Sequence, residues 1–192
     1  TNIYIYNNIF KWQFGYGILM EGAQSVYIYH NTFYEKSTAC PPSAAFVAVQ
    51  SSSHATVENN IFYSGSSTIG LENATNYVTN DYNLYYNSTI TSGSETHGVF
   101  SKNPLFVSTT DYSLQATSPA IGAGTPITAV KTDYRDSLRS TTAPTIGAFE
   151  YTGTNPNPGV PVFSDASVEN ATPTILGMTY SLNLASIVPA TS

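Results

Sequence analysis

The sequence predicts an all-β solenoid, and two observations lead to this prediction. A pattern of alternating apolar and polar residues, closed by Asn, a variable residue and an aromatic residue, recurs at residues 3–10, 26–33, 55–62 and, more weakly, 78–85. Alternation with a period of two is typical of β-strands, and no segment shows a convincing helical period. The shared Asn recurs after 23, 29 and 23 residues. A repeat of this length is typical of coils of short strands that stack on one another.

Each copy contributes one asparagine and, two residues later, one aromatic ring. Coils stacked at the strand spacing of about 4.8 Å align equivalent residues in rows along the solenoid axis. Stacked amides can donate to one neighbour and accept from the other, which satisfies groups that are costly when buried unpaired. Asn also tolerates the left-handed backbone that a sharp corner needs. The asparagine row is Asn8, Asn31, Asn60 and Asn83, and the aromatic row, predicted to stack inside the coil, is Phe10, Phe33, Phe62 and Tyr85.

A second apolar segment lies between successive copies. These segments, at residues 17–20, 45–49 and 69–71, predict further strands, so that each coil holds two or three short strands. The six extra residues of the 29-residue repeat fit a loop near Cys40. We therefore assign residues 1–100 to the rungs of the solenoid.

The stretch after the rungs carries a series of short motifs. They are Asn103-Pro104-Leu105-Phe106 and the segments 111–114, 118–124, 133–139 and 146–151. The rungs resemble the right-handed parallel β-helix repeats of bacterial surface proteins and polysaccharide-active enzymes. The motif series resembles the C-terminal end of secreted bacterial β-helix proteins of the choice-of-anchor Q type. The resemblance covers residues 1–151, and it implies a right-handed parallel β-helix that ends in a C-terminal cap.

The segment 101–151 is predicted to form this cap. The last rung of a solenoid exposes an unpaired edge that must be covered. Asp133, Arg139 and Glu150 are charges in a charge-poor chain. We expect a buried or half-buried Arg139 that pairs with one of the two carboxylates, which is a structural role rather than a catalytic one.

The composition changes after Tyr151. Residues 152–160 form a Gly- and Pro-containing segment that predicts a linker. Residues 161–192 alternate again and resemble the start of a bacterial Ig-like repeat. Because a complete sandwich of this type needs about 100 residues, the segment predicts a truncated Ig-like domain, and we expect the chain to be a fragment of a longer protein.

Charge and hydropathy exclude two classes of partner. The net charge is −6 and only 9% of the residues are charged. Because sequence-independent binding to nucleic acid depends on positive charges that contact the phosphates, such binding is not expected. No apolar run approaches the roughly 18 residues of a membrane span. The low fraction of charged residues is typical of exported bacterial surface proteins. This composition predicts an extracellular or cell-surface location. The family resemblance also suggests an export or surface-attachment apparatus as a partner.

The outward rows of the first strands hold the candidate binding residues. Alternation predicts that four tyrosines point outward: Tyr4, Tyr6, Tyr27 and Tyr29. They are predicted either to form a platform for sugar rings or to form a surface ladder that stabilises the strands. The ladder is the simpler interpretation of the two.

One carboxylate pair is placed together by the repeat. Glu58 and Asp81 fall one rung apart in the same outward row. Like charges at this spacing repel, so the pattern predicts either that one is protonated or that a cation such as Ca²⁺ lies between them. The alternative is two solvated carboxylates whose side chains splay apart. No residue pattern in the chain identifies a catalytic residue.

The sequence thus predicts a secreted cell-surface or adhesion module that binds polysaccharide and is non-catalytic in this fragment. One alternative is the C-terminal part of a polysaccharide lyase or glycoside hydrolase whose catalytic rungs are missing. Another is a purely structural spacer in a surface fibre that binds no glycan.

Overall fold

The computed structural model describes residues 2–11, 16–36, 45–51, 53–73, 77–91 and 94–153, together with two short strands near the C-terminus. The chain divides into two compact units, Thr1–Asn155 and Pro156–Ser192. In the second unit, β12 (Thr174–Ile175) pairs with β13 (Met178–Thr179) in antiparallel fashion. Apart from these four residues, the predicted Ig-like segment 161–192 lies outside the described residues, as does most of the predicted linker.

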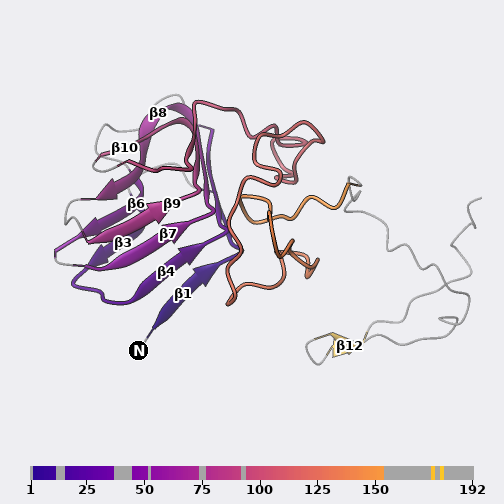
Figure 1. Ribbon diagram of the computed structural model, residues 1–192, viewed down its shortest axis with the longest axis horizontal. Coiled ribbons are helices and arrows are strands. Elements are labelled where there is room, and N and C mark those ends of the chain that lie inside the picture. Colours follow the sequence, from indigo (N-terminus) through magenta and orange to yellow (C-terminus); the bar gives the residue numbers. More distant parts are fainter. Residues whose placement is uncertain are drawn as a thin grey trace, which may run out of the picture. The chain divides into compact units, whose positions relative to one another are not determined.

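The first unit consists of parallel strands that coil into stacked rungs (Figure 1). One sheet holds β1 (Ile3–Tyr6), β4 (Val26–Tyr29), β7 (Ala55–Glu58) and β9 (Val78–Asp81). A second holds β2 (Ile9–Lys11), β5 (Thr32–Glu35), β8 (Ile61–Asn73), β10 (Leu84–Ile90) and β11 (Val99–Phe100). On the remaining side, β3 (Tyr16–Glu21) and β6 (Ala45–Gln50) pair with each other, and β6 also pairs with β8.

The strand register reproduces the repeats of the sequence. Tyr4 pairs with Tyr27, Tyr27 with Thr56, and Thr56 with Thr79, all in parallel strands. The prediction of an all-β parallel β-helix is therefore confirmed for the described residues between positions 2 and 100. Within the described residues, no helix is long and apolar enough to cross a membrane.

An aromatic column fills the interior of the coil. Phe10, Phe33, Phe62 and Tyr85 stack with ring centroids 4.7, 5.1 and 5.1 Å apart, as predicted. Phe100 adds a fifth ring, 5.1 Å from Tyr85. Ile28 and Val57, from the other sheet, are fully buried in the same core. Alternation thus sends one side of each sheet into a common apolar interior.

The asparagine row lies at the corner between the two sheets. Nδ2 of Asn8 donates to Oδ1 of Asn31 at 3.1 Å, and the same bond joins Asn31 to Asn60 and Asn60 to Asn83 at 3.0 Å. Each backbone N–H of Asn8, Asn31 and Asn60 also donates to the next Oδ1, at 2.8–2.9 Å. The second proton of each inner amide reaches a backbone carbonyl, for example Ile28 O from Asn60. The ladder therefore satisfies the buried polar groups of the corner.

The sharp corner itself depends on the residue before each ladder asparagine. Asn7, His30, Asn59 and Tyr82 have φ values of 57, 50, 59 and 57°. The repeat pattern predicted the left-handed conformation at Asn8 and its equivalents, whereas the structure places it one residue earlier. The physical reason is that the ladder asparagine must project its amide along the axis, and the turn is made just before it.

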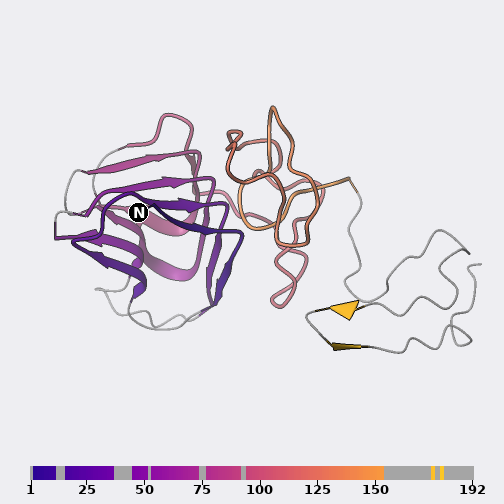
Figure 2. The ribbon, with the colours of Figure 1, turned by 90° about the horizontal axis from the view of Figure 1, so that it is seen from below.

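The segment 101–151 packs along one side of the rungs (Figures 1 and 2). It contains two isolated antiparallel bridges, Phe106 with Leu114 and Thr132 with Leu138, and little other regular structure. It reaches all the way back to the first rung, where Nη2 of Arg139 donates to Oδ1 of Asn7 at 2.8 Å. Along the way, the N–H of Gly147 donates to Asn59 O, and the N–H of Ala148 donates to Thr32 Oγ1.

This arrangement differs from a cap over the last rung alone. The segment covers the outward side of β2, β5, β8 and β10, which we call the covered face. Ile61 and Leu84 of this face pack with Leu114 and Ile146, and Tyr34 packs with Phe149. Several outward residues of these strands, such as Ile61, Leu84 and Tyr34, are apolar or aromatic, and burying apolar surface is worth about 25 cal/mol per Å². The segment therefore removes apolar surface of several strands from water, in addition to any shielding of a strand edge.

Candidate binding face

The outward side of β1, β4, β7 and β9 is the one on which the candidate residues gather. We call it the open face, and its outward residues are Tyr4, Tyr6, Tyr27, Tyr29, Thr56, Glu58, Thr79 and Asp81. None of them belongs to the hydrophobic clusters formed by the described residues. The alternate residues of the same strands, such as Ile28 and Val57, fill the interior. The open face is thus the polar, aromatic half of the alternation.

The four candidate tyrosines differ in exposure. Tyr4 and Tyr6 are 45% and 43% exposed, and Tyr27 is half-buried. The rings of Tyr4 and Tyr27 stack at 4.8 Å with their planes 15° apart. Tyr29 is buried, with its ring 5.8 Å from that of Tyr27. Burial, and then the charge of Glu58, raise the pKa of Tyr29 to about 12, so Tyr29 offers little surface to a ligand.

The stacking of Tyr4 on Tyr27 is the geometry of a surface ladder. Within the pair, each ring uses one face against its neighbour. What remains accessible is the outer face of Tyr4, the ring edges and the phenol hydroxyls. These groups offer hydrogen bonds and C–H contacts to a ligand that lies across the strands.

Glu58 and Asp81 are brought side by side on β7 and β9. Oδ1 of Asp81 accepts from the backbone N–H of Tyr82 at 2.9 Å and from that of His97 at 2.7 Å, and Oδ2 lies 2.8 Å from Nδ1 of His97. Burial by itself raises the pKa of Asp81, but the bonds from His97 and Tyr82 outweigh it and hold that pKa below its usual value. Burial, followed by the charges of Asp81 and Glu95, raises the pKa of Glu58.

These contacts bear on the predicted cation between the two carboxylates. Both oxygens of Asp81 already face nitrogen atoms of His97 or Tyr82. Among the described residues, no group of three or more His, Cys, Asp or Glu side chains could hold a metal ion together. Any ion at Glu58 and Asp81 would therefore have to take its remaining ligands from backbone carbonyls, amide or hydroxyl oxygens, water or a bound molecule.

His97 lies in a loop, and the structure gives it two contacts with the fourth rung. Its ring stacks on that of Tyr82 at 4.4 Å with the planes 7° apart, and it pairs with Asp81 while its side chain remains 53% exposed. The sequence offers no repeat signal for this contact, because His97 comes from the loop after the fourth rung.

Glu95 is a structural residue that the repeat pattern did not reveal. Its carboxylate accepts from the backbone N–H and the Nδ2 of Asn83, at 3.0 and 2.8 Å, and from the hydroxyl of Tyr85 at 2.6 Å. It therefore ends the asparagine ladder in place of a fifth asparagine, at the end to which all the amide donors point. Burial raises its pKa, although the bonds from Tyr85 and Asn83 oppose this.

The three charges predicted to be structural lie together in the segment 101–151. Nη1 of Arg139 is 3.4 Å from Oε2 of Glu150, with both side chains nearly inaccessible to solvent. Asp133 accepts backbone N–H bonds from Arg135, Ser137 and Glu150. Burial lowers the pKa of Arg139 to about 10, against the opposing charges of Glu150 and Asp133. The cluster ties the segment together and, through Asn7, ties it to the first rung.

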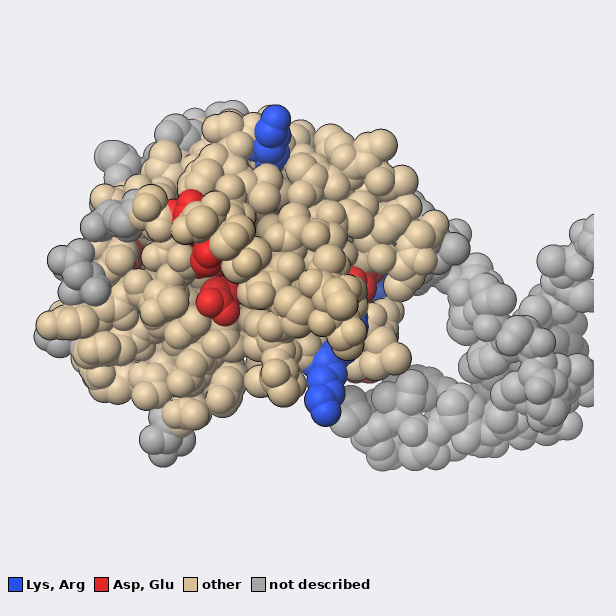
Figure 3. All heavy atoms as spheres, in the orientation of Figure 1, with Lys and Arg blue, Asp and Glu red and all other residues tan. Residues whose placement is uncertain are grey.

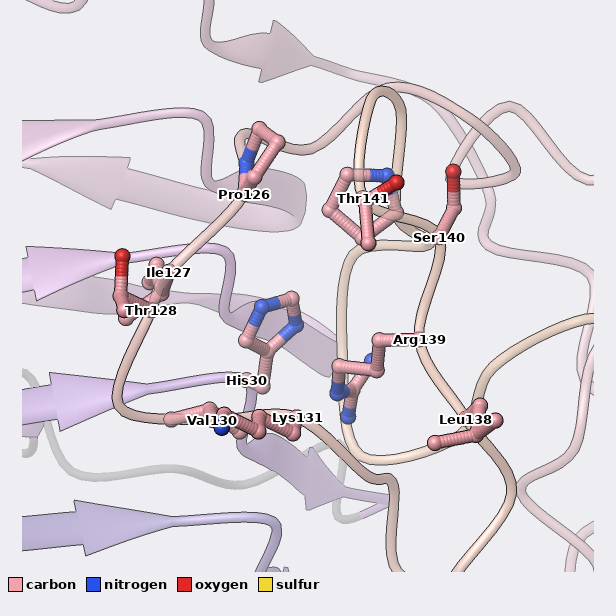
Figure 4. A pocket seen from close by; sticks show the side chains of 11 residues that line it. His30, Pro126, Ile127, Thr128, Val130, Lys131, Leu138, Arg139, Ser140 and Thr141 are labelled. Atoms are coloured by element: carbon pink, nitrogen blue, oxygen red, sulfur yellow. The ribbon is translucent and has the colours of Figure 1, made fainter.

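A pocket of about 400 Å³ opens between this segment and the corner (Figure 4). Its walls are mainly apolar, and His30 and Arg139 stand side by side within it. His30 is fully buried, and its Nε2 is 3.0 Å from Nδ2 of Asn59. Burial, and then the charge of Arg139, lower the pKa of His30 well below its usual value.

A smaller pocket of about 230 Å³ lies beside Tyr34 and Phe106. Neither pocket is lined by a residue of the open face.

Comparison with known proteins agrees with this architecture. The model of a family described as the right handed beta helix region matches residues 1–120, which is more than half of the chain. A search among curated proteins finds no match.

Proposed function

The chain belongs to the right-handed β-helix family, and we propose that it is a secreted cell-surface or adhesion module that binds polysaccharide through the open face without turning it over. The single observation that carries the proposal is the contrast between the two outer faces. The segment 101–151 covers one of them, whereas the other keeps Tyr4 and Tyr6 more than two-fifths exposed.

The chemistry of the open face supports a sugar ligand. A polysaccharide presents rows of hydroxyl groups and apolar C–H patches at regular intervals. The open face presents phenol groups, threonine hydroxyls and carboxylates, repeated along the axis at the strand spacing of about 4.8 Å. An extended chain lying parallel to the axis can therefore meet similar groups on successive rungs.

The secreted, surface-located role rests on different support. Only 9% of the residues are charged, and the motif series of the segment 101–151 resembles secreted choice-of-anchor Q proteins. This resemblance also underlies the expected export or attachment apparatus, for which no particular residue is assigned.

The test is affinity gel electrophoresis of the purified chain against a panel of polysaccharides. The panel consists of hydroxyethylcellulose, xylan, galactomannan, polygalacturonate and chitosan, and the variant is Tyr4→Ala combined with Tyr27→Ala. The matched control is Tyr134→Ala, which removes a 56% exposed tyrosine that lies outside the open face. We expect at least one polysaccharide to retard the protein, and the double variant to weaken this retardation about tenfold, as for the loss of about 1.4 kcal/mol.

Three results would overturn the proposal. Retardation by no member of the panel would favour a structural spacer. Equal losses in the double variant and in Tyr134→Ala would move the site away from the open face. Release of reducing or unsaturated ends from any member would favour the enzyme interpretation.

A further inference from the structure

The open face is negatively charged along the rungs that follow the tyrosines. Glu58 and Asp81 occupy its third and fourth strands, and none of its outward residues is Lys or Arg. In Figure 3, acidic side chains gather over this sheet, and the Lys and Arg side chains in view lie away from them. A ligand that follows the axis across the face must therefore pass over these carboxylates.

Neighbouring residues of the fold hold the carboxylate of Asp81 in place and in its ionised form. Its carboxylate is held by His97 from two nitrogen atoms and by the N–H of Tyr82, so it keeps its position and its ionised form. His97 is itself held flat against the ring of Tyr82. Side-chain contacts thus hold the acidic end of the face, as ring stacking holds the tyrosine end.

The tyrosine end and the acidic end adjoin each other. Tyr29 on β4 pairs in register with Glu58 on β7, and Glu58 pairs with Asp81 on β9. The three residues are successive members of one outward row. A sugar chain that contacts Tyr27 and its neighbours therefore lies within one or two rungs of both carboxylates.

We propose that the open face takes uncharged polysaccharides and excludes those that carry carboxylate or sulfate groups, an inference that rests on the proposed function. Sugar hydroxyls donate well to carboxylates, because hydrogen bonds with an ionised acceptor are stronger than neutral ones. A uronate or sulfate over the same rungs meets like charge, and repulsion of this kind is an effective way to reject a competing ligand. The selectivity therefore comes from Glu58 and Asp81, and the contact surface comes from the tyrosines.

The experiment compares two forms of one polysaccharide. The neutral member of the panel that binds best is compared with its uronate form. For galactomannan or hydroxyethylcellulose, the free C6 alcohols are oxidised to carboxylates, which adds charge and leaves the backbone linkages unchanged. For xylan, whose pentose units have no C6, the uronate form is a glucuronoxylan with the same backbone. Binding of both forms is measured at low salt and at about 1 M salt, where the screening length falls to about 3 Å. The variants are Glu58→Gln alone and Glu58→Gln with Asp81→Asn, and Glu21→Gln, an exposed acid on β3, is the control.

The uronate form is expected to bind at least about tenfold more weakly at low salt, with the difference falling below about threefold at high salt. Both charge-removing variants are expected to recover binding of the uronate form, and Glu21→Gln is not. The salt comparison uses the unaltered protein, so the result does not depend on the variants folding.

Two kinds of failure are distinguishable. If an acidic polysaccharide is the best binder, or if both forms bind equally at low salt, the charge selectivity is wrong and the binding function stands. If no polysaccharide binds in any form, the proposed function fails, and the selectivity fails with it.

Discussion

The two outer faces of the solenoid start from the same alternation and end in different environments. On the second rung, Tyr27 of the open face and Tyr34 of the covered face both point outward, and each stacks on a tyrosine of a neighbouring rung at 4.8 Å and 15°. Tyr27 is half-buried, whereas Tyr34 is 4% exposed beneath Tyr112 and Phe106. Stacking along the axis therefore does not by itself decide burial; the segment 101–151 does.

The two faces therefore contribute differently: the covered face to the stability of the fold, and the open face to the surface that a ligand can reach. The covered face joins the rungs to the C-terminal segment through apolar clusters and the Arg139 network. The open face contributes to no such cluster among the described residues, so its exposed side chains, such as Tyr4 and Tyr6, can be changed with little loss of folding energy. That is the property expected of a surface that evolves to recognise ligands.

The sharpest test of the comparison is the pair Tyr34→Ala and Tyr27→Ala. Removing the buried Tyr34 ring leaves a cavity and should lower the free energy of unfolding by about 3–5 kcal/mol. Removing Tyr27 breaks only a cross-strand pair, which is worth about 1 kcal/mol or less. Urea denaturation measures both, and equal losses would mean that the two faces are energetically alike.

A second test measures how closely the segment 101–151 packs against the covered face, at the contact between Gly147 and Ile61. Gly147 has a φ of 98°, and a Cβ there would lie 2.5 Å from Ile61 Cδ1. Gly147→Ala should therefore cost about 1–2 kcal/mol for the backbone conformation and about 1–3 kcal/mol for the overpacking. Gly153, with a φ of 82° and no atom within 4 Å of such a Cβ, isolates the backbone contribution. If Gly147→Ala and Gly153→Ala lower the midpoint of thermal unfolding equally, the close contact with Ile61 does not exist.

A third test concerns the corner between the two faces. In Glu95→Gln, the new NH₂ group would face Asn83, whose N–H and NH₂ groups are themselves donors, and at least one donor would be left buried and unpaired. We expect a loss of about 1–3 kcal/mol in the free energy of unfolding. The same change at the exposed Glu21 should stay within about 0.5 kcal/mol. A neutral result at Glu95 would mean that the ladder needs no anionic acceptor at its end.

The smallest effect is a pH dependence from His30, which lies at the same corner beneath the segment. Its pKa is lowered in the folded protein by burial and by Arg139, so below the unfolded value of about 6.5 the unfolded chain binds the extra proton. The free energy of unfolding should therefore fall as the pH drops below about 6.5, by at most about 1.4 kcal/mol per pH unit.

The variant His30→Asn provides the matched comparison, because Asn7 and Asn59 occupy the same left-handed position in the neighbouring rungs. The raised pKa values of Glu58 and Glu95 act in the opposite direction as the pH falls, and they remain in both proteins. The difference between the two pH profiles, followed by urea denaturation, thus isolates His30. Parallel profiles from pH 7 to pH 5 would show that His30 is not held neutral.

Much of the solenoid could be predicted from sequence because its contacts are periodic. Asn31 meets Asn60 because both hold the same place in the repeat, and the same logic predicted the stack of Phe33 on Phe62. It also predicted that Glu58 and Asp81 lie side by side. Residues that stand outside the repeat gave no such signal. Glu95 and His97 come from one irregular loop, and their contacts with Asn83 and Asp81 depend on how that loop folds back.

The sequence by itself determined the rungs, their register and the rows along them, because period-two alternation and a recurring Asn admit one stacking of the coils. Only the tertiary structure decided which outer face is buried. The outward residues of both sheets include tyrosines, and local patterns do not distinguish a tyrosine that faces water from one that faces another segment. The path of the segment 101–151 makes that distinction, through long-range contacts such as Arg139 with Asn7 and Gly147 with Asn59. Such contacts join residues far apart in the chain, and they depend on the sum of many small packing energies rather than on any local pattern.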